Sequence, residues 1–364
     1  MSKSYVNEVY YSDLKYIREH LGQKDIEKLK DATLLITGCA GFLGFYIMSF
    51  FLQYADELKI NKIIGIDNFK LGIPDWINDL AGSTKVELQD MDITQFQNFD
   101  TRNIQHVDYV MHMASIASPT FYRRYPLETV DANVWGLRML LDFFKNKPLK
   151  GFLFFSSSEV YGDPPPTEIP TSETYRGNVA IIGPRACYDE AKRFGEVLCS
   201  IFAEQYQMPI TIVRPFNNYG PGMKLQDKRV PADFANYVIR NENIILHSDG
   251  TPTRTFCYVA DAIVGYIKAL VYGSFDYFNI GIDDPEISVR ELAEIYRAAG
   301  DELFGYTVGL EFKLSDEAKY LTHNPSRRCP DLTKARSLLH YAPSISIEEG
   351  VRRFLKFNKI GGSM

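Results

Sequence analysis

The chain has 364 residues, of which 45% are hydrophobic and 24% are charged. This composition is typical of a folded globular protein with a sizeable core, as one large domain or two smaller ones. The formal net charge of -6 argues against nucleic acid or an anionic membrane surface as the main partner.

Residues 1–30 precede the first strong strand pattern and are expected to form an arm, packed on the body of the protein or on a second subunit. Ser12 is expected to cap a short helix that ends at Gly22. The arm has no apolar stretch like that of a signal peptide. No segment approaches the roughly 18 apolar residues that a membrane span needs. The sequence therefore predicts no membrane partner.

The cysteines are odd in number and scattered, without a C-x-x-C pair, and the six histidines show no metal-ligand spacing. This pattern predicts neither a structural disulfide nor a metal site. A reducing, cytoplasmic compartment is the simplest interpretation. The cysteines are Cys39, Cys187, Cys199, Cys257 and Cys329.

From residue 32 onward, strand patterns alternate with helical patterns, which indicates an α/β fold with a doubly wound parallel sheet. The expected strands are 32–38, 62–67, 86–93, 107–115, 150–158 and 209–215. The expected helices are 42–58, 127–145 and 188–205. Beyond residue 215, polar loops rich in glycine, proline and basic residues indicate a smaller domain that closes over a ligand.

The stretch "TGCAGFLG" places Gly38, Gly41 and Gly44 three apart, between a strand and a helix. Glycines permit a tight turn there, and a pyrophosphate can then approach the N–H groups of the helix start, including those of Phe42 and Leu43. A bare glycine pattern is also compatible with a simple strand-to-helix turn. The flanking strand and helix favour dinucleotide binding.

Asp67 ends the next strand and is followed by Asn68. A carboxylate at this position accepts hydrogen bonds from a ribose 2′-OH and repels a 2′-phosphate, so it favours NAD over NADP. Asp92 and Ile93, after the third strand, are candidates for holding the adenine, although Asp92 is equally suited to capping a turn.

These patterns predict a Rossmann-type NAD-binding domain over residues 31–215, with a return segment near 255–282. A smaller C-terminal α/β domain, formed by 216–254 and 283–364, is expected to bind the substrate.

The stretch "SSSEVYGDPPPTEI" follows an apolar strand with three hydroxyls and a carboxylate. It is either a plain loop or part of an active site at the carboxyl edge of the sheet, where Ser157, Ser158 and Glu159 would face a ligand.

Tyr188 and Lys192 are four apart on an expected helix, so both lie on one face. A lysine near a phenol favours the phenolate, which would make Tyr188 a base for removing a hydroxyl proton. A Tyr-x-x-x-Lys pair also occurs on ordinary solvated helix faces. The glycine loop and the serine-ended strand favour the catalytic interpretation.

These three features together resemble the extended short-chain dehydrogenase/reductase superfamily, which acts on nucleotide sugars. The resemblance runs from about Thr33 to Gly350. It implies that the serine-ended strand lies beside the nicotinamide, with its hydroxyls and Glu159 facing the sugar. It also implies cofactor contacts at Ala114, Ser115 and Asn133.

Several segments are most similar to those of UDP-glucuronate decarboxylases: "ASPTFYRRYP", "SSSEVYGDP", "GNVAIIGPRACYDEAKR", "PFNNYGPGM", "DGTPTRTFCYV" and "NPSRRCPDLTKA". The sugar dehydratases of the superfamily usually carry an Asp-Glu pair before "VYG". Here the pair is Ser158-Glu159, and a serine is a poor acid for expelling a C6 hydroxyl.

The resemblance implies that Tyr188 takes the C4 hydroxyl proton while hydride passes to NAD, with Ser157 bonded to the C4 oxygen. Arg254 would lie near the carboxylate and stabilise an enolate after loss of CO2, and Glu159 would help to position or protonate. Arg254 could instead be a surface residue, and Glu159 a turn cap.

The resemblance also implies contacts with the nucleotide-sugar substrate. Asn217 would contact the diphosphate, and Arg229 and Arg328 are candidates for the nucleotide end. Arg185 either touches the substrate or pairs with Glu190. The full expected substrate set is Pro119, Tyr122, Arg185, Asn217, Arg229, Arg254 and Arg328.

The loop at 220–230 departs from the decarboxylase pattern, with Lys228 where a glycine is expected, and 302–324 matches little. Substrate identity therefore stays open. A 4-epimerase, a 4,6-dehydratase, a C4 dehydrogenase and a non-catalytic NAD-binding protein remain alternatives. By analogy with the family, the helix carrying Tyr188 and the helix near 134–144 form a homodimer interface; alternatively, both cover the sheet of a monomer.

Overall fold

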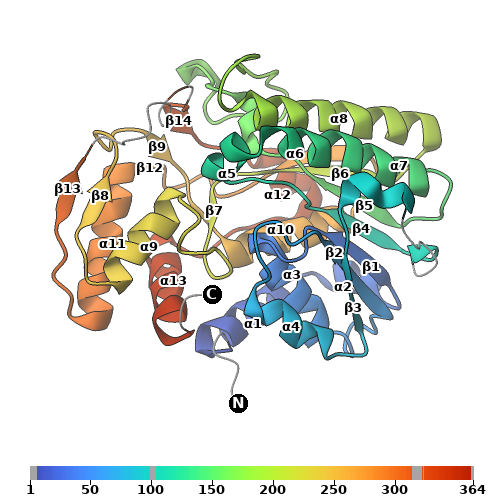
Figure 1. Ribbon diagram of the computed structural model, residues 1–364, viewed down its shortest axis with the longest axis horizontal. Coiled ribbons are helices and arrows are strands. Elements are labelled where there is room, and N and C mark those ends of the chain that lie inside the picture. The colour runs from blue at the N-terminus through green and yellow to red at the C-terminus, as the bar shows by residue number, and fades with distance from the viewer. Residues whose placement is uncertain (1–5, 99–103, 314–321, 323, 362–364) are drawn as a thin grey trace.

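A seven-stranded sheet forms the centre of the protein (Figure 1). The computed structural model describes residues 6–98, 104–313, 322 and 324–361. Every pair of neighbouring strands is parallel, and the order is β11-β6-β5-β4-β1-β2-β3. The strands are β1 Thr33–Thr37, β2 Lys62–Asp67, β3 Val86–Asp90, β4 Tyr109–His112, β5 Gly151–Phe155, β6 Ile210–Pro215 and β11 Asp276–Ile280. The order reverses between β1 and β4, where such sheets open a crevice for ligands.

The strands are buried on both faces, which explains their nearly continuous apolar sequences. Leu34 and Ile36 of β1 point into one hydrophobic core, and Leu35 between them points into another. On β5, Phe152 and Phe154 alternate with Leu153 in the same way. The sheet is therefore the shared wall of two cores.

Helices cover both faces of the sheet (Figure 1). One face carries α3 (Phe42–Gln53), α4 (Asp75–Ala81) and α10 (Val259–Leu270). The other carries α6 (Pro126–Asp131), the π-helical turn η3 (Ala132–Gly136), α7 (Leu137–Phe144) and α8 (Ala186–Tyr206). The helix expected at 127–145 thus contains a π turn, and the one expected at 188–205 starts two residues earlier.

The N-terminal arm packs on the body of the protein. It consists of α1 (Glu8–His20) and α2 (Gln23–Leu29), and α1 contacts α3, α10 and α13 (Ile347–Gly361). The expected cap at Ser12 is wrong, because Asn7 caps α1 by accepting the N–H of Tyr10 at 3.2 Å.

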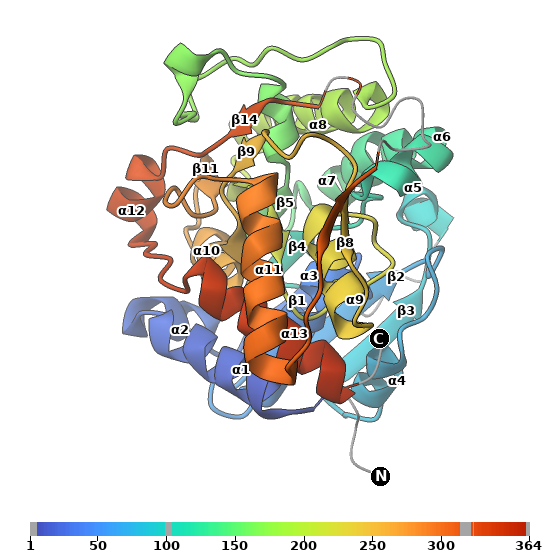
Figure 2. The ribbon, with the colours of Figure 1, turned by 90° about the vertical axis from the view of Figure 1, so that its left-hand side faces the viewer.

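A smaller layer of helices and short strands lies beside the sheet, and this layer faces the viewer in Figure 2. It contains α9 (Val230–Ile239), α11 (Val289–Phe304) and the parallel pair β8 (Ile244–Leu246) and β13 (Leu310–Phe312). The remaining helices are α5 (Pro119–Arg124) and α12 (Thr333–Leu339), with short helices η1 (Ile93–Asn98), η4 (Ser158–Tyr161) and η5 (Pro166–Glu168). The remaining strands are β7 (Asn218–Tyr219), β9 (Thr253–Arg254), β10 (Cys257–Tyr258), β12 (Ile287–Ser288) and β14 (Arg327–Arg328).

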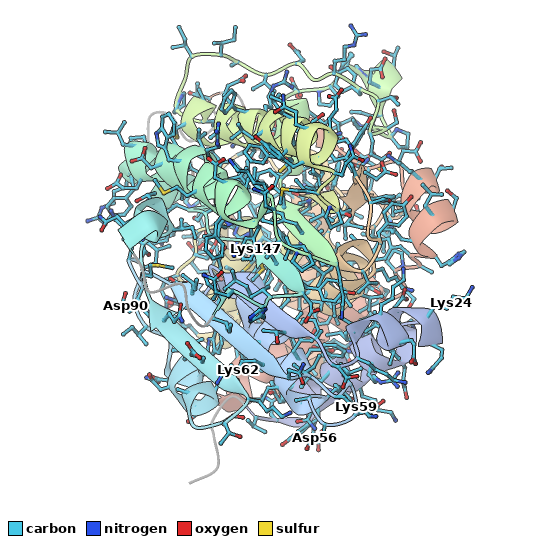
Figure 3. All side chains as sticks on the ribbon, turned by 90° about the vertical axis from the view of Figure 1, so that its right-hand side faces the viewer. Lys24, Asp56, Lys59, Lys62, Asp90 and Lys147 are labelled. Atoms are coloured by element: carbon cyan, nitrogen blue, oxygen red, sulfur yellow. The ribbon has the colours of Figure 1, made fainter. Side chains whose placement is uncertain are left out.

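The two ends of the sheet differ in what surrounds them. Figure 3 shows Lys62, the first residue of β2, and Asp90, the last residue of β3, at opposite ends of the parallel strands. The carboxyl ends, on the side of Asp90, carry the predicted site residues. Among the described residues, no helix is long and apolar enough to cross a membrane. All five cysteines are free thiols.

Candidate active site

A cavity of about 610 Å³ runs along the carboxyl ends of the strands, from the glycine loop to α9 and β8. Every residue predicted for the site lines this cavity except Asn133 and Arg328. The cofactor and substrate predictions thus fall in one continuous space, with Tyr188 and Lys192 between its two ends.

The glycine loop approaches its neighbours more closely than any side chain would allow. A Cβ on Gly44 would lie 2.0 Å from the carbonyl oxygen of Cys39, and one on Gly38 would lie 2.7 Å from the nitrogen of Ala114. Gly38 also has φ of +71°. Gly41 precedes α3 without a side-chain cap, so the first N–H groups of α3 lack a side-chain acceptor there. This cradle fits a dinucleotide pyrophosphate.

Asp67 anchors the glycine loop. Its carboxylate accepts the N–H of Ala40 at 3.0 Å and that of Phe69 at 2.9 Å. Asn68 donates to Asp92 at 3.2 Å, which ties the ends of β2 and β3 together. Asp67 lines the cavity at the end predicted to hold the cofactor. That its carboxylate accepts a hydrogen bond from a ribose hydroxyl stays a prediction.

Asn133 does not line the cavity, which corrects its assignment as a direct cofactor contact. Its side chain is fully buried in the π turn and donates to the Ser115 hydroxyl at 2.9 Å and to the carbonyl of Thr129 at 2.7 Å. Because Ser115 lines the cavity, Asn133 orients a cavity residue from behind.

Tyr188 lies in the first turn of α8, with 6% of its surface exposed. Its ring stacks on Tyr122 of α5 at 5.2 Å between centroids and 13° between planes. Burial raises the pKa of Tyr188 to about 12, while Ser157 and Arg229 act to lower it.

Lys192 lies one turn further along α8, 3% exposed, and donates to the carbonyl of Phe155 at 2.5 Å. Its nitrogen is 5.7 Å from the centroid of the Tyr188 ring. Burial lowers the pKa of Lys192 to about 7. Lys192 contacts a backbone carbonyl, and the pKa of Tyr188 is set mainly by burial, Ser157 and neighbouring charges. The expectation that Lys192 lowers the pKa of Tyr188 therefore stays a prediction.

Three arginines surround Glu159, and we call Arg185, Arg254, Arg328 and Glu159 the arginine cluster. Arg185 binds the Glu159 carboxylate, and Arg328 donates to the same oxygen at 3.1 Å. Although burial opposes ionisation, Arg185 and Arg328 lower the pKa of Glu159 to about 2. Glu159 therefore stays anionic at neutral pH. An ionised Glu159 is suited to positioning neighbouring groups and not to donating a proton to the substrate. Of its two predicted roles, positioning therefore remains.

Arg328 belongs to this cluster and not to the nucleotide end, which corrects its assignment. It is 3% exposed and donates to the Ser158 hydroxyl at 2.9 Å and to the carbonyl of Gly162 at 3.0 Å. Because its donors serve the serine-ended strand, Arg328 holds that segment in place.

Arg254 differs from the other two arginines because its contacts are neutral. Its guanidinium donates to the carbonyls of Thr253, Ser326 and Pro325, and it forms no ion pair with the described residues. Burial, together with Arg328, lowers the pKa of Arg254 to about 10. It lines the cavity as a cation that a ligand anion can neutralise.

The loop at 220–230 forms the wall between the two ends of the cavity. Asp227 binds Arg229, and the Ser118 hydroxyl donates to the carbonyl of Asp227 at 2.7 Å. Lys228 adopts φ of +68°, the left-handed conformation that favours glycine. A glycine, which the family pattern has there, adopts this conformation without strain.

The remaining predicted substrate residues lie close to the ends of strands and helices. Asn217 follows β6 and donates to the carbonyl of Thr255 at 2.9 Å. Pro119 begins α5, which carries Tyr122. Arg185 lies 3.5 Å from Asp189 and does not pair with Glu190. Asp189 was missed from the sequence, although its spacing of four from Arg185 on a helix was available as a signal.

Comparisons with known proteins agree with this geometry. Residues 34–281 match the model of the NAD dependent epimerase/dehydratase family. UDP-glucuronic acid decarboxylase 1 of Arabidopsis thaliana is 34% identical over 326 residues, covering 90% of this chain and 69% of that protein. UDP-glucuronic acid decarboxylase 5 of the same plant is 35% identical, covering 87% and 86%.

Solved structures share the fold. UDP-glucose 4-epimerase of Thermotoga maritima, solved with UDP-glucose, has a TM-score of 0.76 and 25% identity, covering 89% of this chain and 98% of that one. UDP-glucuronic acid 4-epimerase of Bacillus cereus, solved with NAD, has a TM-score of 0.72 and 24% identity, covering 89% and 96%.

Proposed function

The chain belongs to the NAD-dependent epimerase/dehydratase family, and we propose that it decarboxylates UDP-glucuronate to UDP-xylose through oxidation at C4. The carrying observation is the arginine cluster beside Tyr188. Arg254 lines the cavity with a guanidinium that donates to backbone carbonyls and forms no ion pair with a described carboxylate. A uronate carboxylate supplies the missing anion, whereas a neutral hexose does not.

The cofactor residues line one end of the cavity, and the substrate residues line the other. The glycine loop, Asp67 and Asp92 would hold NAD, which supplies the hydride acceptor and donor for C4 together with the positive charge of its oxidised nicotinamide. Tyr188 would remove the C4 hydroxyl proton, and Ser157, which acts to lower the pKa of Tyr188, would hold the C4 oxygen.

Loss of CO2 follows from the ketone that this oxidation creates. The C4 ketone is β to the carboxylate, so the C5–C6 bond can break and leave its electron pair on an enolate. Arg254 would orient the carboxylate and stabilise the enolate oxygen through its N–H groups. C5 then takes up a proton, and Tyr188 returns its proton to the C4 oxygen when the ketone is reduced. Glu159, held ionised, would fix Arg185 and Arg328 around the sugar.

The direct test is mass spectrometry of the nucleotide sugar after incubation of the purified protein with NAD and UDP-glucuronate. We expect a product with the mass of UDP-glucuronate less CO2, as in UDP-xylose. A product lacking two further hydrogens would be a released ketone. An unchanged mass with altered chromatography would indicate a 4-epimerase. An unchanged substrate with folded, NAD-loaded protein would refute the proposal and direct the search to other nucleotide sugars.

We further propose a homodimer, formed through α8 and the π turn. Phe194, Val197 and Ile201 are 49%, 51% and 40% exposed, and their spacing places them on one face of α8. Trp135 of η3, which packs against α8, is 58% exposed. A second copy of this face would cover the patch. Light scattering of Val197→Asp should give a monomer, whereas Leu338→Asp, at an exposed apolar position on α12, should leave the dimer intact.

The reducing compartment follows from the thiols. All five cysteines are free, and four of them are buried. We therefore place the enzyme in the cytoplasm, where thiols stay reduced. A fluorescent fusion that localised elsewhere would contradict this assignment.

A further inference from the structure

Asp189 lies in the catalytic helix α8 directly after Tyr188, and the mechanism above leaves it without a role. It is 6% exposed. One of its carboxylate oxygens is 3.5 Å from Nε of Arg185, which is too long for a hydrogen bond. The other oxygen, Oδ1, is buried without a hydrogen-bond partner, as is Nε of Arg185. A buried ion pair left loose in this way is unusual enough to require an explanation.

The partner of Asp189 is also the partner of Glu159. Arg185 binds Glu159 of η4 through NH2 and faces Asp189 of α8 through Nε. Its guanidinium therefore bridges two carboxylates from different elements. Across the centre, the three guanidinium groups of the arginine cluster face two carboxylates, which leaves one positive charge in excess.

We propose that Asp189 is a positioning residue of the reaction: it holds the Nε edge of Arg185, so that the other edge serves Glu159 and the sugar, and it limits the excess charge to one. This inference rests on the proposed function, because a single excess charge matches the single carboxylate of a uronate. Without Asp189, Arg185 could swing toward the substrate carboxylate and draw it away from Arg254.

The protonation of Asp189 supports this role. Burial, and then the charge of Glu159, raise the pKa of Asp189 to about 7, against the lowering effect of Arg185 and Arg328. Positioning should therefore weaken as the pH falls below about 7 and Asp189 becomes neutral. The titratable and charged groups that act on it from α8 and its N-cap, η4, β14 and α5 are Arg185, Cys187, Tyr188, Glu159, Arg328 and Tyr122.

The first test is Asp189→Asn, which keeps the shape and removes the charge. We expect kcat to fall about 10- to 50-fold, KM for UDP-glucuronate to stay equal or decrease, and NAD content and melting temperature to hold. The acid limb of the pH profile should flatten toward the low rate. An unchanged kcat, or a melting temperature that falls together with kcat, would overturn the proposal. Glu190→Gln is the matched control, since Glu190 pairs with Arg193 on the outside of the same helix.

The second test is a double-mutant cycle. If Asp189 acts through Arg185, adding Asp189→Asn to Arg185→Ala should cause no further loss of kcat. Losses that multiply would refute the inference, because Asp189 would then act elsewhere. A wild type that is inactive on UDP-glucuronate but turns over another nucleotide sugar would refute the proposed substrate alone, and the same cycle on that sugar would still decide the role of Asp189.

Discussion

The two ends of the cavity are built by different means. The cofactor end comes from consecutive strand ends, β1 to β4, and its geometry is set by backbone: glycines that no side chain could replace, and an Asp67 that ties N–H groups. The sugar end is set by charge, with arginines at 185, 254 and 328 converging on Glu159. Local sequence patterns therefore reveal the first end, and only long-range contacts reveal the second.

Substitution of Tyr188 should separate catalysis from cofactor binding most clearly. Tyr188 should be needed for the chemistry and not for binding NAD. We expect Tyr188→Phe to lower kcat at least ~10³-fold, because the variant lacks the phenol oxygen that would take the C4 hydroxyl proton. NAD content, measured after denaturation, should stay within twofold of wild type. Retained activity would remove Tyr188 from the mechanism; Tyr11→Phe, on the exposed face of α1, is the control.

Lys192 is expected to lower the free energy of unfolding of the protein. Its ammonium is 3% exposed and binds a carbonyl, with no described carboxylate in contact. Lys192→Met should lower kcat ~10²-fold, yet stabilise the fold by ~1–3 kcal/mol because an uncompensated buried charge is removed. Denaturant unfolding of both proteins checks this, and a less stable variant would contradict it.

The same lysine predicts a pH dependence. Its pKa is lowered from 10.5 to about 7 in the folded state, so the unfolded chain binds more protons between those values. The free energy of unfolding should therefore rise with pH across that window. In Lys192→Met this contribution should vanish. Equal slopes for both proteins between pH 7.5 and ~10 would show that Lys192 is charged in the fold.

Arg254 should separate the two half-reactions at the sugar end. Arg254→Ala is expected to lower decarboxylation about 10²-fold, through loss of enolate stabilisation. Oxidation at C4 should suffer less, so absorbance of reduced nicotinamide should build up during turnover. Arg254→Lys keeps the positive charge but lacks the planar guanidinium that binds a carboxylate through two parallel hydrogen bonds. This variant should recover part of the decarboxylation rate. An unchanged rate in the alanine variant would remove Arg254 from the chemistry.

The smallest expected effect on catalysis is in the N-terminal arm, whose helix α1 packs on α3, α10 and α13. Asp13 is fully buried and accepts from the hydroxyls of Tyr46 and Tyr258 at 2.6 Å and from Arg353 at 2.8 Å. Asp13→Ala leaves three donors unpaired and should destabilise the fold by ~3–4 kcal/mol. The kcat of the folded fraction at 20 °C should hold. Asp56→Ala, at an exposed position, is the stability control.

Much of the sheet and the cofactor end could be predicted from the sequence. Apolar runs identified the first six strands, the glycines marked the tight turn between β1 and α3, and a spacing of four placed Tyr188 and Lys192 on one face. These features follow from backbone sterics and helical geometry, which act over a few residues. The cap of α1 was assigned to Ser12 although Asn7 makes it by a local contact with Tyr10, and the π turn after α6 was not detected.

What the sequence determined by itself, then, is the fold class, the glycine loop between β1 and α3, and the helix that carries Tyr188 and Lys192. Only the tertiary structure decided the protonation and the partners: that Glu159 is ionised, that Arg328 serves Ser158 and not the nucleotide, and that Lys192 binds a carbonyl. The reason is physical. Burial and the nearest opposite charge set these properties, and both come from segments that lie up to 170 residues apart in the chain.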